Sequence, residues 1–586
     1  MLQFNKVFLS IYLLVGAYAS AYSQADSIER KPNIVLILVD DSGLMDFGAF
    51  GGEAKTPNID QLAKEGMMFT NMHASPVCAP SRAMLMTGSD CHFAGVANLP
   101  EMLPKKFQGK PGYGGVLNDR VQTIATRLKE ADYNTYVTGK WHLGHDQKTL
   151  PIKRGFDRSF ILGASGADNY EAKGYLPMKA TAQWYADGSP VDLPKDFYSS
   201  KTYIDKTISF HQEEQNKDQP FFSYIAFQAI HTPIQAPFEL VEKYKPIYKN
   251  GWDKMREKRF EKAKQLGFIP FNAELNNDYH LFKKWDGLTK KEQNVYITDM
   301  SVTAAMLEAM DFHIGRYINY LTQEGLIENT IFIVTSDNGP DGADYQPMEL
   351  WAKTQGYHRN LEKYGSKGYY GSLGPEFANA VASPFSYFKY YTGEGGLRVP
   401  LIIKGTKLPG KIQSDEFCFF TDIAPTIYDL AGLSTSANKG YAPITGKSML
   451  PHILDINVPI YANDEGVGLE VANSSAYFFN NYKIVKNNIP IGDNSWHMYD
   501  LSADPGETND IASSNAVLFQ KMLSEYQDYE AEVGVISMPN GYHAQKEVGK
   551  KSIIALLKSI GPYFIVFLLL IVGFIYWHKS NRQVAG

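Results

Sequence analysis

The stretch "NIVLILVDD", residues Asn33–Asp41, decides the fold class of this 586-residue chain. Its apolar run from Ile34 to Val39 is rich in β-branched side chains and ends in two aspartates. A strand that is apolar at every position, and not only at alternate ones, is typical of a parallel sheet buried on both faces. The sequence therefore predicts a central strand whose carboxyl end carries Asp40 and Asp41.

Strands and helices alternate after this first strand. The segments 56–69 and 301–321 have helical periodicity, while 220–233 and 330–340 are apolar strands that end in polar residues. Such alternation predicts an α/β fold with a mostly parallel sheet flanked by helices. From about residue 440 the pattern changes to short antiparallel strands and one helix, which predicts a smaller C-terminal α+β subdomain.

The predicted strands end in residues that are able to bind ions or transfer protons. Ligands bind beyond the carboxyl ends of parallel strands, so these side chains are expected to meet at one edge of the sheet. They are Asp40, Asp41, Lys140, His142, His231, Asp337 and Asn338. The Asp-Asp and Asp-Asn pairs offer only oxygen donors, which favours Ca²⁺ over Mg²⁺ and disfavours zinc. A capping role explains either pair alone more simply, but two pairs on two strand ends argue for a metal site.

The stretch "PVCAPSRAMLMTGSD", residues 76–90, places one of the three cysteines directly before a Pro-Ser-Arg turn. Cys78 is a core residue, a thiol nucleophile or the precursor of a modified residue, and spacing alone does not choose among these. Cys91 and Cys418 are interpreted as ordinary small apolar residues. So few cysteines predict no disulfide framework.

The composition is that of an ordinary globular protein, with 44% hydrophobic and 20% charged residues. The net charge of -6 argues against a nucleic-acid-binding protein, because such proteins usually carry an excess of basic residues. It does not exclude an anionic substrate, since a few well-placed cations bind one locally.

Both ends of the chain predict targeting segments. The start has one early cation, Lys6, and an apolar run, which is typical of a secretory signal. The uncharged stretch 559–577 is long enough for one membrane span at about 1.5 Å per residue, with a buried C-terminal helix as the alternative. We expect an exported, periplasmic or extracytoplasmic domain anchored in the membrane. The predicted parts are a signal peptide at 1–23, a catalytic domain at 30–440, a subdomain at 441–535, a linker at 536–558, a transmembrane helix at 559–577 and a cytoplasmic tail at 578–586.

Several motifs together resemble one enzyme family. Residues 78–88 match the C-x-P-S-R-x-x-x-x-T-G signature of type I sulfatases. The segments "GKWHLG" at 139–144, "AIHTP" at 229–233, "TSDNGP" at 335–340 and "KYYTGEGGLRVP" at 389–400 are similar to further family motifs, in the same order. The resemblance covers about residues 30–535 and is strongest to bacterial arylsulfatases. It implies an alkaline-phosphatase-like fold and the hydrolysis of sulfate esters.

The resemblance also implies that a maturation enzyme converts Cys78 to formylglycine. One hydroxyl of the formylglycine hydrate would attack sulfur to give a covalent sulfo-enzyme, and the other would then release sulfate. The residues implied to contact the metal are Asp40, Asp41, Cys78, Asp337 and Asn338. Arg82 would hold the hydrate, Lys140 would stabilise the nucleophile, and His142 would accept a proton. His231 and Lys389 would bind the sulfate and protonate the leaving oxygen.

Other interpretations remain open at this stage. The substrate is expected to be a small aryl sulfate or a sulfated glycan. A phosphonate or phosphate ester hydrolase on the same scaffold is one alternative, and a catalytically silent sulfoglycan-binding protein is another. His73, His92, His145 and Ser165 are candidates for lining the pocket, although a structural role is the simpler expectation for each. The charged segment 242–268 is interpreted as a solvated excursion, with an anion-attracting lid as the alternative.

Overall fold

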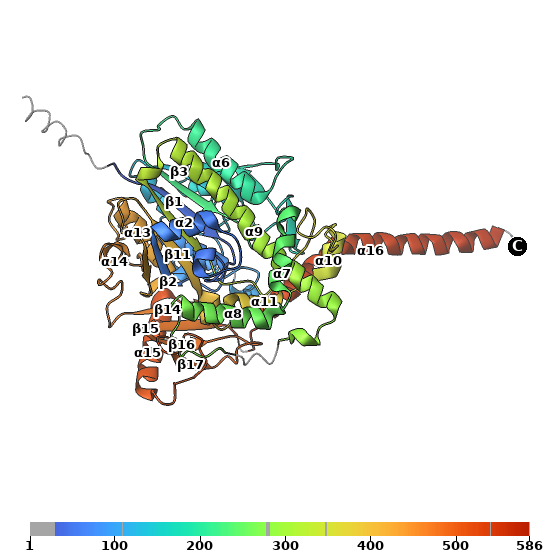
Figure 1. Cartoon of the computed structure of the whole chain (residues 1–586). Coiled ribbons are helices and arrows are strands. Elements are labelled where there is room, and N and C mark those ends of the chain that lie inside the picture. The colour runs from blue at the N-terminus through green and yellow to red at the C-terminus, as the bar shows by residue number, and fades with distance from the viewer. Residues whose placement is uncertain (1–29, 108, 277–281, 346–347, 540, 585–586) are drawn as a thin grey trace, which may run out of the picture.

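The computed structural model describes residues 30–107, 109–276, 282–345, 348–539 and 541–584 (Figure 1). The predicted signal peptide at 1–23 lies outside the described residues. The side chains of 545, 559–567 and 576–584 also lie outside them.

A large mixed sheet forms the centre of the molecule. Strand β1 (Asn33–Val39) lies between two parallel neighbours, β10 (Thr330–Ser336) and β9 (Phe221–Ala226). The parallel part continues through β3 (Asn134–Lys140) and β4 (Arg158–Leu162). Beyond β10 the sheet continues with β11 (Arg398–Lys404), which runs antiparallel both to β10 and to its other neighbour, β2 (Met67–His73). The predicted α/β class is confirmed.

Helices cover both faces of this sheet, which explains why β1 is apolar at every position. Side chains of α2 (Pro57–Glu65), α6 (Ser199–Glu213) and α9 (Lys290–Gln323) pack with Val35, Ile37 and Val39. On the opposite face, α3 (Cys78–Thr87), α5 (Ile124–Lys129) and α13 (Ile423–Leu430) pack with Ile34, Leu36 and Leu38. Every residue of β1 is therefore buried.

A second, antiparallel sheet lies in the C-terminal part of the chain. Its strands, in order, are β14 (Gly466–Val471), β15 (Ser474–Phe479), β16 (Tyr482–Lys486) and β17 (Trp496–Asp500). Helix α15 (Ala516–Val533) packs Met522 and Tyr526 against this sheet. Lys483 of β16 joins it to the larger domain, since the ammonium lies 2.9 Å from Glu394 and 2.8 Å from Glu507.

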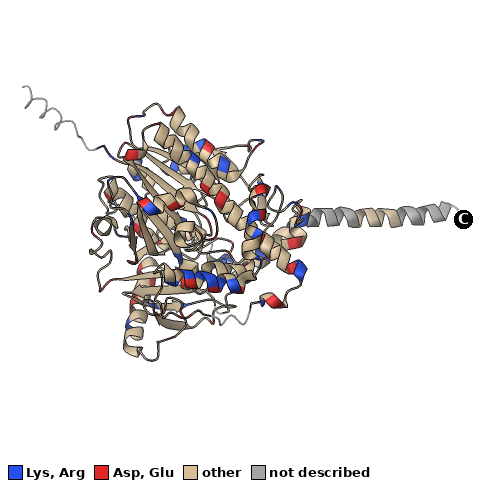
Figure 2. Cartoon of the chain, viewed as in Figure 1, with Lys and Arg blue, Asp and Glu red and all other residues tan. Residues whose placement is uncertain are grey.

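The charged segment 242–268 packs one face onto the domain, so it is only in part the solvated excursion that the sequence suggested. Helix α8 (Gly251–Gln265) buries one face that includes Trp252 and Phe260, and Figure 2 shows basic residues along the same helix. Arg259 is buried in that face and forms ion pairs with Asp46 and Glu53. Only part of the positive charge therefore faces solvent.

The C-terminal helix α16 (Ala544–Val584) begins within the predicted linker and projects away from the domain (Figure 1). Its first turns are anchored, because Lys551 donates to the carbonyls of Pro100 and Leu103 at 2.8 and 2.6 Å. In the described part of the chain, no helix combines the length and apolar character needed to cross a membrane. The predicted span 559–577 falls in α16, and its side chains at 559–567 and 576–577 are outside the described residues.

Candidate active site

The residues that follow β1 and β10 meet at the carboxyl edge of the sheet. Val39 pairs with Ser336, so the chain continues on both strands into adjacent polar residues. The backbone N–H of Asp41 donates to Asp337 at 3.2 Å, and the Asn338 amide donates to Asp41 at 2.7 Å. All of these side chains are buried. The structure thus brings both predicted oxygen-donor pairs into one cluster.

Cys78 reaches this cluster as the first residue of α3, a helix whose ten residues are all buried. Arg82 follows one turn later and forms two contacts with one oxygen of Asp337, from Nε at 2.9 Å and from Nη2 at 2.8 Å. Arg82 Nη1 donates to the carbonyl of Lys140 at 2.7 Å. Because these contacts fix both ends of the guanidinium, Arg82 holds the start of α3 against the ends of β3 and β10.

Two lysines pair with the two neighbouring aspartates. Lys140, the last residue of β3, donates to Asp40. Lys389 comes from a distant part of the chain and lies 2.7 and 2.9 Å from the two carboxylate oxygens of Asp41. Burial alone raises the pKa of Asp41, but Lys389, His231 and Lys140 together outweigh this effect and hold the pKa at about 2. Asp41 is therefore a carboxylate.

Two histidines complete the set of predicted residues. His142 Nδ1 lies 3.4 Å from the sulfur of Cys78, and His231 Nε2 lies 3.9 Å from a carboxylate oxygen of Asp41. Burial lowers the pKa of both imidazoles, and the charge of Lys140 lowers that of His142 further. The other ring nitrogen of His231 lies 2.5 Å from the carbonyl of Thr232. Since a carbonyl only accepts, this contact assigns the ring proton to Nδ1 and leaves Nε2 facing the site.

The protein residues present fit a hard divalent cation. Two buried oxygens, Asp40 Oδ1 and Asn338 Oδ1, have no hydrogen-bond partner among the described residues. Ligand atoms of Asp40, Cys78 and Asp337 lie within 4.8 Å of one another. Burial and the nearby Asp337 raise the pKa of Asp40, so this cluster has more negative charge than its surroundings compensate. A metal ion would supply the missing positive charge and bind the unpaired oxygens.

The surroundings of Cys78 do not suit a thiolate. Burial raises the pKa of the thiol, although Lys140 and Lys389 act in the opposite direction. Reactive cysteines usually have a lowered pKa and partial exposure, and Cys78 is 2% exposed. Of the three interpretations left open by the sequence, the working thiol is the one that this site does not support.

The additional histidines suggested by the sequence do not all join the site. His73 pairs with Glu394 at 2.9 Å, and His92 pairs with Asp90 at 2.9 Å and Glu470 at 3.2 Å, so both are buried structural residues. His145 is exposed. Sequence reasoning missed Asp341, which lies 3.6 Å from Lys389, because only the fold brings the two together.

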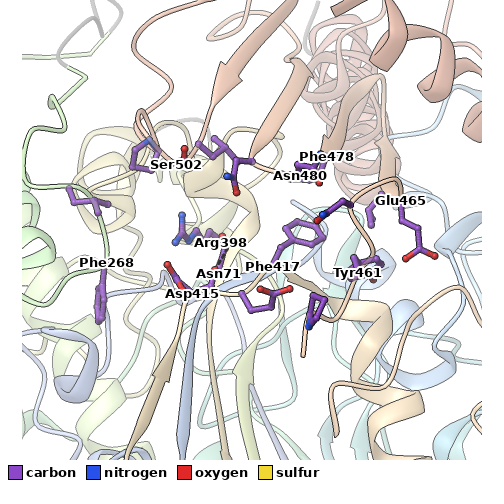
Figure 3. A pocket seen from close by; sticks show the side chains of 18 of the residues that line it. Asn71, Phe268, Arg398, Asp415, Phe417, Tyr461, Glu465, Phe478, Asn480 and Ser502 are labelled. Atoms are coloured by element: carbon purple, nitrogen blue, oxygen red, sulfur yellow. Dashed lines mark hydrogen bonds between the residues drawn. The ribbon is translucent and has the colours of Figure 1, made fainter. Parts of the chain in front are cut away.

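A cavity of about 790 Å³ lies apart from these residues, between the edge of the large sheet and the C-terminal sheet (Figure 3). Asn71, Arg398 and Asp415 lie on one side of it, and Asn480 and Ser502 on the other. None of the predicted catalytic or metal-binding residues lines it. The size of a cavity is therefore no guide to the chemistry of this chain.

Comparison with known proteins identifies the class that this fold and site define. Residues 32–433 match the family model described as sulfatase. An uncharacterized sulfatase of Schizosaccharomyces pombe is 36% identical over 548 residues, which cover 89% of this chain and 97% of that protein. An arylsulfatase of Klebsiella aerogenes is 34% identical over 453 residues, covering 75% of this chain and 94% of the relative.

A solved structure agrees in fold. The crystal structure of Ps i-CgsB in complex with k-i-k-neocarrahexaose is 25% identical, with a TM-score of 0.60, and the match covers 85% of this chain and 93% of that one. The fold, the site and these relatives define a sulfuric ester hydrolase. The chain belongs to the sulfatase family.

Proposed function

We propose that this chain hydrolyses the sulfate ester of an aryl compound or a carbohydrate to an alcohol and inorganic sulfate, using formylglycine formed from Cys78. The observation that carries the proposal is the position of Cys78. It begins a buried helix, 3.4 Å from His142 and beside a cluster of oxygen donors that suits a metal ion. As its hydrate, formylglycine supplies one hydroxyl that attacks sulfur and a second that allows sulfate to leave.

The surrounding residues would bind the charged group and move protons. His231 Nε2 faces the site and would protonate the departing oxygen, while Lys389 would hold the sulfate by charge. His142 is the group positioned to accept a proton from residue 78, since its ring is neutral and in contact with that side chain. Arg82 and Lys140 would keep residue 78 in place and stabilise negative charge there.

We propose Ca²⁺ as the resident metal, with Mg²⁺ as the less favoured choice. Asp40, Asp41, Asp337 and Asn338 would hold it through oxygen atoms, which is the ligand type that Ca²⁺ takes in proteins. The ion would neutralise charge on the sulfate oxygens. Among the described residues, one oxygen of Asp40 and one of Asn338 have no hydrogen-bond partner, which supports a cation held by oxygen atoms.

The finer points of specificity are tested by comparing substrates. Turnover of 4-nitrophenyl sulfate should exceed that of 4-nitrophenyl phosphate and phenylphosphonate. Good phosphonate turnover without sulfate turnover would instead establish the related phosphonate hydrolase. Absence of turnover on all three, with binding of sulfated glycans retained, would favour the silent binding protein.

We also propose export and attachment to a membrane, on sequence grounds. The apolar start of the chain and the uncharged stretch 559–577 support this location. Cell fractionation of the native host tests it, since activity in the soluble cytoplasmic fraction alone would contradict it. The partner required for maturation is a formylglycine-generating enzyme, for which Pro80 and Arg82 would be part of the recognition sequence.

A further inference from the structure

A small hairpin lies against His231 and brings hydroxyl and charged groups close to it. Strands β5 (Lys173–Leu176) and β6 (Lys179–Thr181) form this hairpin. The ring of Tyr175 stands edge-on to the ring of His231, with centroids 5.0 Å apart. A Cβ placed on Gly166 would lie 2.8 Å from the His231 ring, so the backbone beside Ser165 also touches this histidine.

The polar groups of this region form one continuous chain. The hydroxyls of Tyr175 and Ser165 lie 2.9 Å apart, and Lys179 donates to Ser165 at 2.8 Å and to Glu101 at 2.7 Å. Lys179 also lies near enough to His142 for its charge to lower the pKa of that imidazole. The chain of groups thus begins beside His231 and includes a lysine whose charge acts on His142.

From this arrangement we infer that Tyr175, Ser165, Lys179 and Glu101 form a subsite that binds the leaving alcohol, and that this alcohol is an uncharged sugar unit. The inference rests on the proposed function, since His231 is the group proposed to protonate the leaving oxygen. An alcohol that departs beside His231 departs next to the ring of Tyr175, whose hydroxyl lies 2.9 Å from that of Ser165.

The chemistry of the subsite favours sugar hydroxyls. Hydroxyls of Ser and Tyr both donate and accept, an ammonium donates and a carboxylate accepts, so neighbouring hydroxyls on a ring find partners of both kinds. The Lys179–Glu101 pair carries no net charge, and a second sulfate would face the Glu101 carboxylate at a cost. The side chain of Lys179 is 24% exposed and is therefore accessible from solvent. Ser165 is 1% exposed and is therefore almost completely buried.

The C-terminal helix fixes the loop that supplies Glu101. Lys551 of α16 binds the carbonyls on either side of this residue, at Pro100 and Leu103, and Tyr542 donates to the carbonyl of Met102 at 2.9 Å. Glu101 is therefore held in place from behind and is 9% exposed. The acceptor of the subsite is thus positioned before a substrate arrives.

The test measures sulfate release from 4-nitrophenyl sulfate and from galactose, glucose, N-acetylglucosamine and N-acetylgalactosamine sulfated at each hydroxyl. The compared proteins are the mature wild type, Lys179→Met, Glu101→Gln and the hairpin control Lys173→Met, whose ammonium lies 3.1 Å from Glu171. Lys179→Met is expected to lower kcat/KM on the best sugar sulfate by about 10- to 100-fold, as for loss of a charged hydrogen bond. The loss on 4-nitrophenyl sulfate should be at least about tenfold smaller, and Lys173→Met should change neither rate.

Three results separate the possibilities. Equal losses on both substrate types would overturn the subsite. A wild type that hydrolyses 4-nitrophenyl sulfate but none of the sugar sulfates would overturn the sugar assignment and leave sulfatase activity intact. A wild type that hydrolyses no sulfate ester would refute the proposed function itself.

Discussion

Lys483 gives the sharpest test of how the C-terminal sheet is attached to the catalytic domain. Its ammonium is fully buried between the carboxylates of Glu394 and Glu507, at 2.9 and 2.8 Å. Lys483→Met removes the cation and leaves both acids buried. Breaking a buried ion pair from one side costs about 3–5 kcal/mol. A tenfold change in an equilibrium constant corresponds to about 1.4 kcal/mol. The fraction of molecules with this sheet detached is therefore expected to rise by more than about 100-fold.

Native-state proteolysis measures that detached fraction, because cleavage follows the population of the open form when closing is fast. Cleavage within 441–535 is expected to be more than about 100-fold faster in Lys483→Met than in wild type. Lys486→Met on the same strand is the control, since that side chain is partly exposed over Trp496. An increase within about threefold in Lys483→Met would refute the argument.

The pH dependence of this effect has a definite sign. Burial raises the pKa of Glu507 to about 7 even with Lys483 present, and Glu394 acts in the same direction. A raised pKa means that the folded state binds the proton of Glu507 more tightly than the unfolded state does. The contribution of Glu507 to the free energy of unfolding therefore falls as pH rises from about 4.5 towards 7. Loss of Lys483 raises the pKa further. The variant should therefore be cleaved less rapidly at pH 6 than at pH 8, and the double variant Lys483→Met/Glu507→Gln should recover part of the resistance.

Two further predictions concern the active site. Removal of metal with EDTA is expected to lower the turnover of sulfate esters by about 100-fold or more, because the ion contributes several kcal/mol of charge stabilisation. Added Ca²⁺ should restore this activity better than Mg²⁺. Full activity in a preparation that elemental analysis shows to be free of metal would contradict the metal site. Arg82→Lys loses the forked contacts to Asp337 and to the Lys140 carbonyl, so we expect a stability loss of about 1.5–3 kcal/mol or more and a lower kcat. A variant with unchanged denaturation midpoint and kcat would show that this geometry is unimportant.

The sequence predicted the parts of the structure that depend on local patterns. The apolar run 34–39 predicts a strand buried on both faces, and helices on both faces are what the structure contains. The polar residues that follow the strands meet at one edge because parallel neighbours end together. These are consequences of strand periodicity and sheet direction, which short segments encode.

The remaining features depend on contacts between distant segments. Glu101 and Lys179 are separated by 78 positions, and neither lies in a recognisable motif. The predicted linker carries no strong signal for docking, yet Lys551 binds a loop 451 and 448 positions away. The buried face of the charged segment 242–268 could not be predicted, because it includes the charged residue Arg259. This residue is buried through ion pairs with Asp46 and Glu53, which lie more than 200 positions earlier. Local sequence patterns do not predict ion pairs between such distant residues.

The chemical state of residue 78 tests the central claim most directly. The measurement is peptide mass spectrometry across 75–82 on protein purified from its native host, combined with turnover of 4-nitrophenyl sulfate by the same sample. We predict formylglycine or its hydrate in place of Cys78, in a proportion that matches the active fraction, and no turnover in Cys78→Ala. Full sulfatase activity in protein that carries only unmodified cysteine would contradict the account.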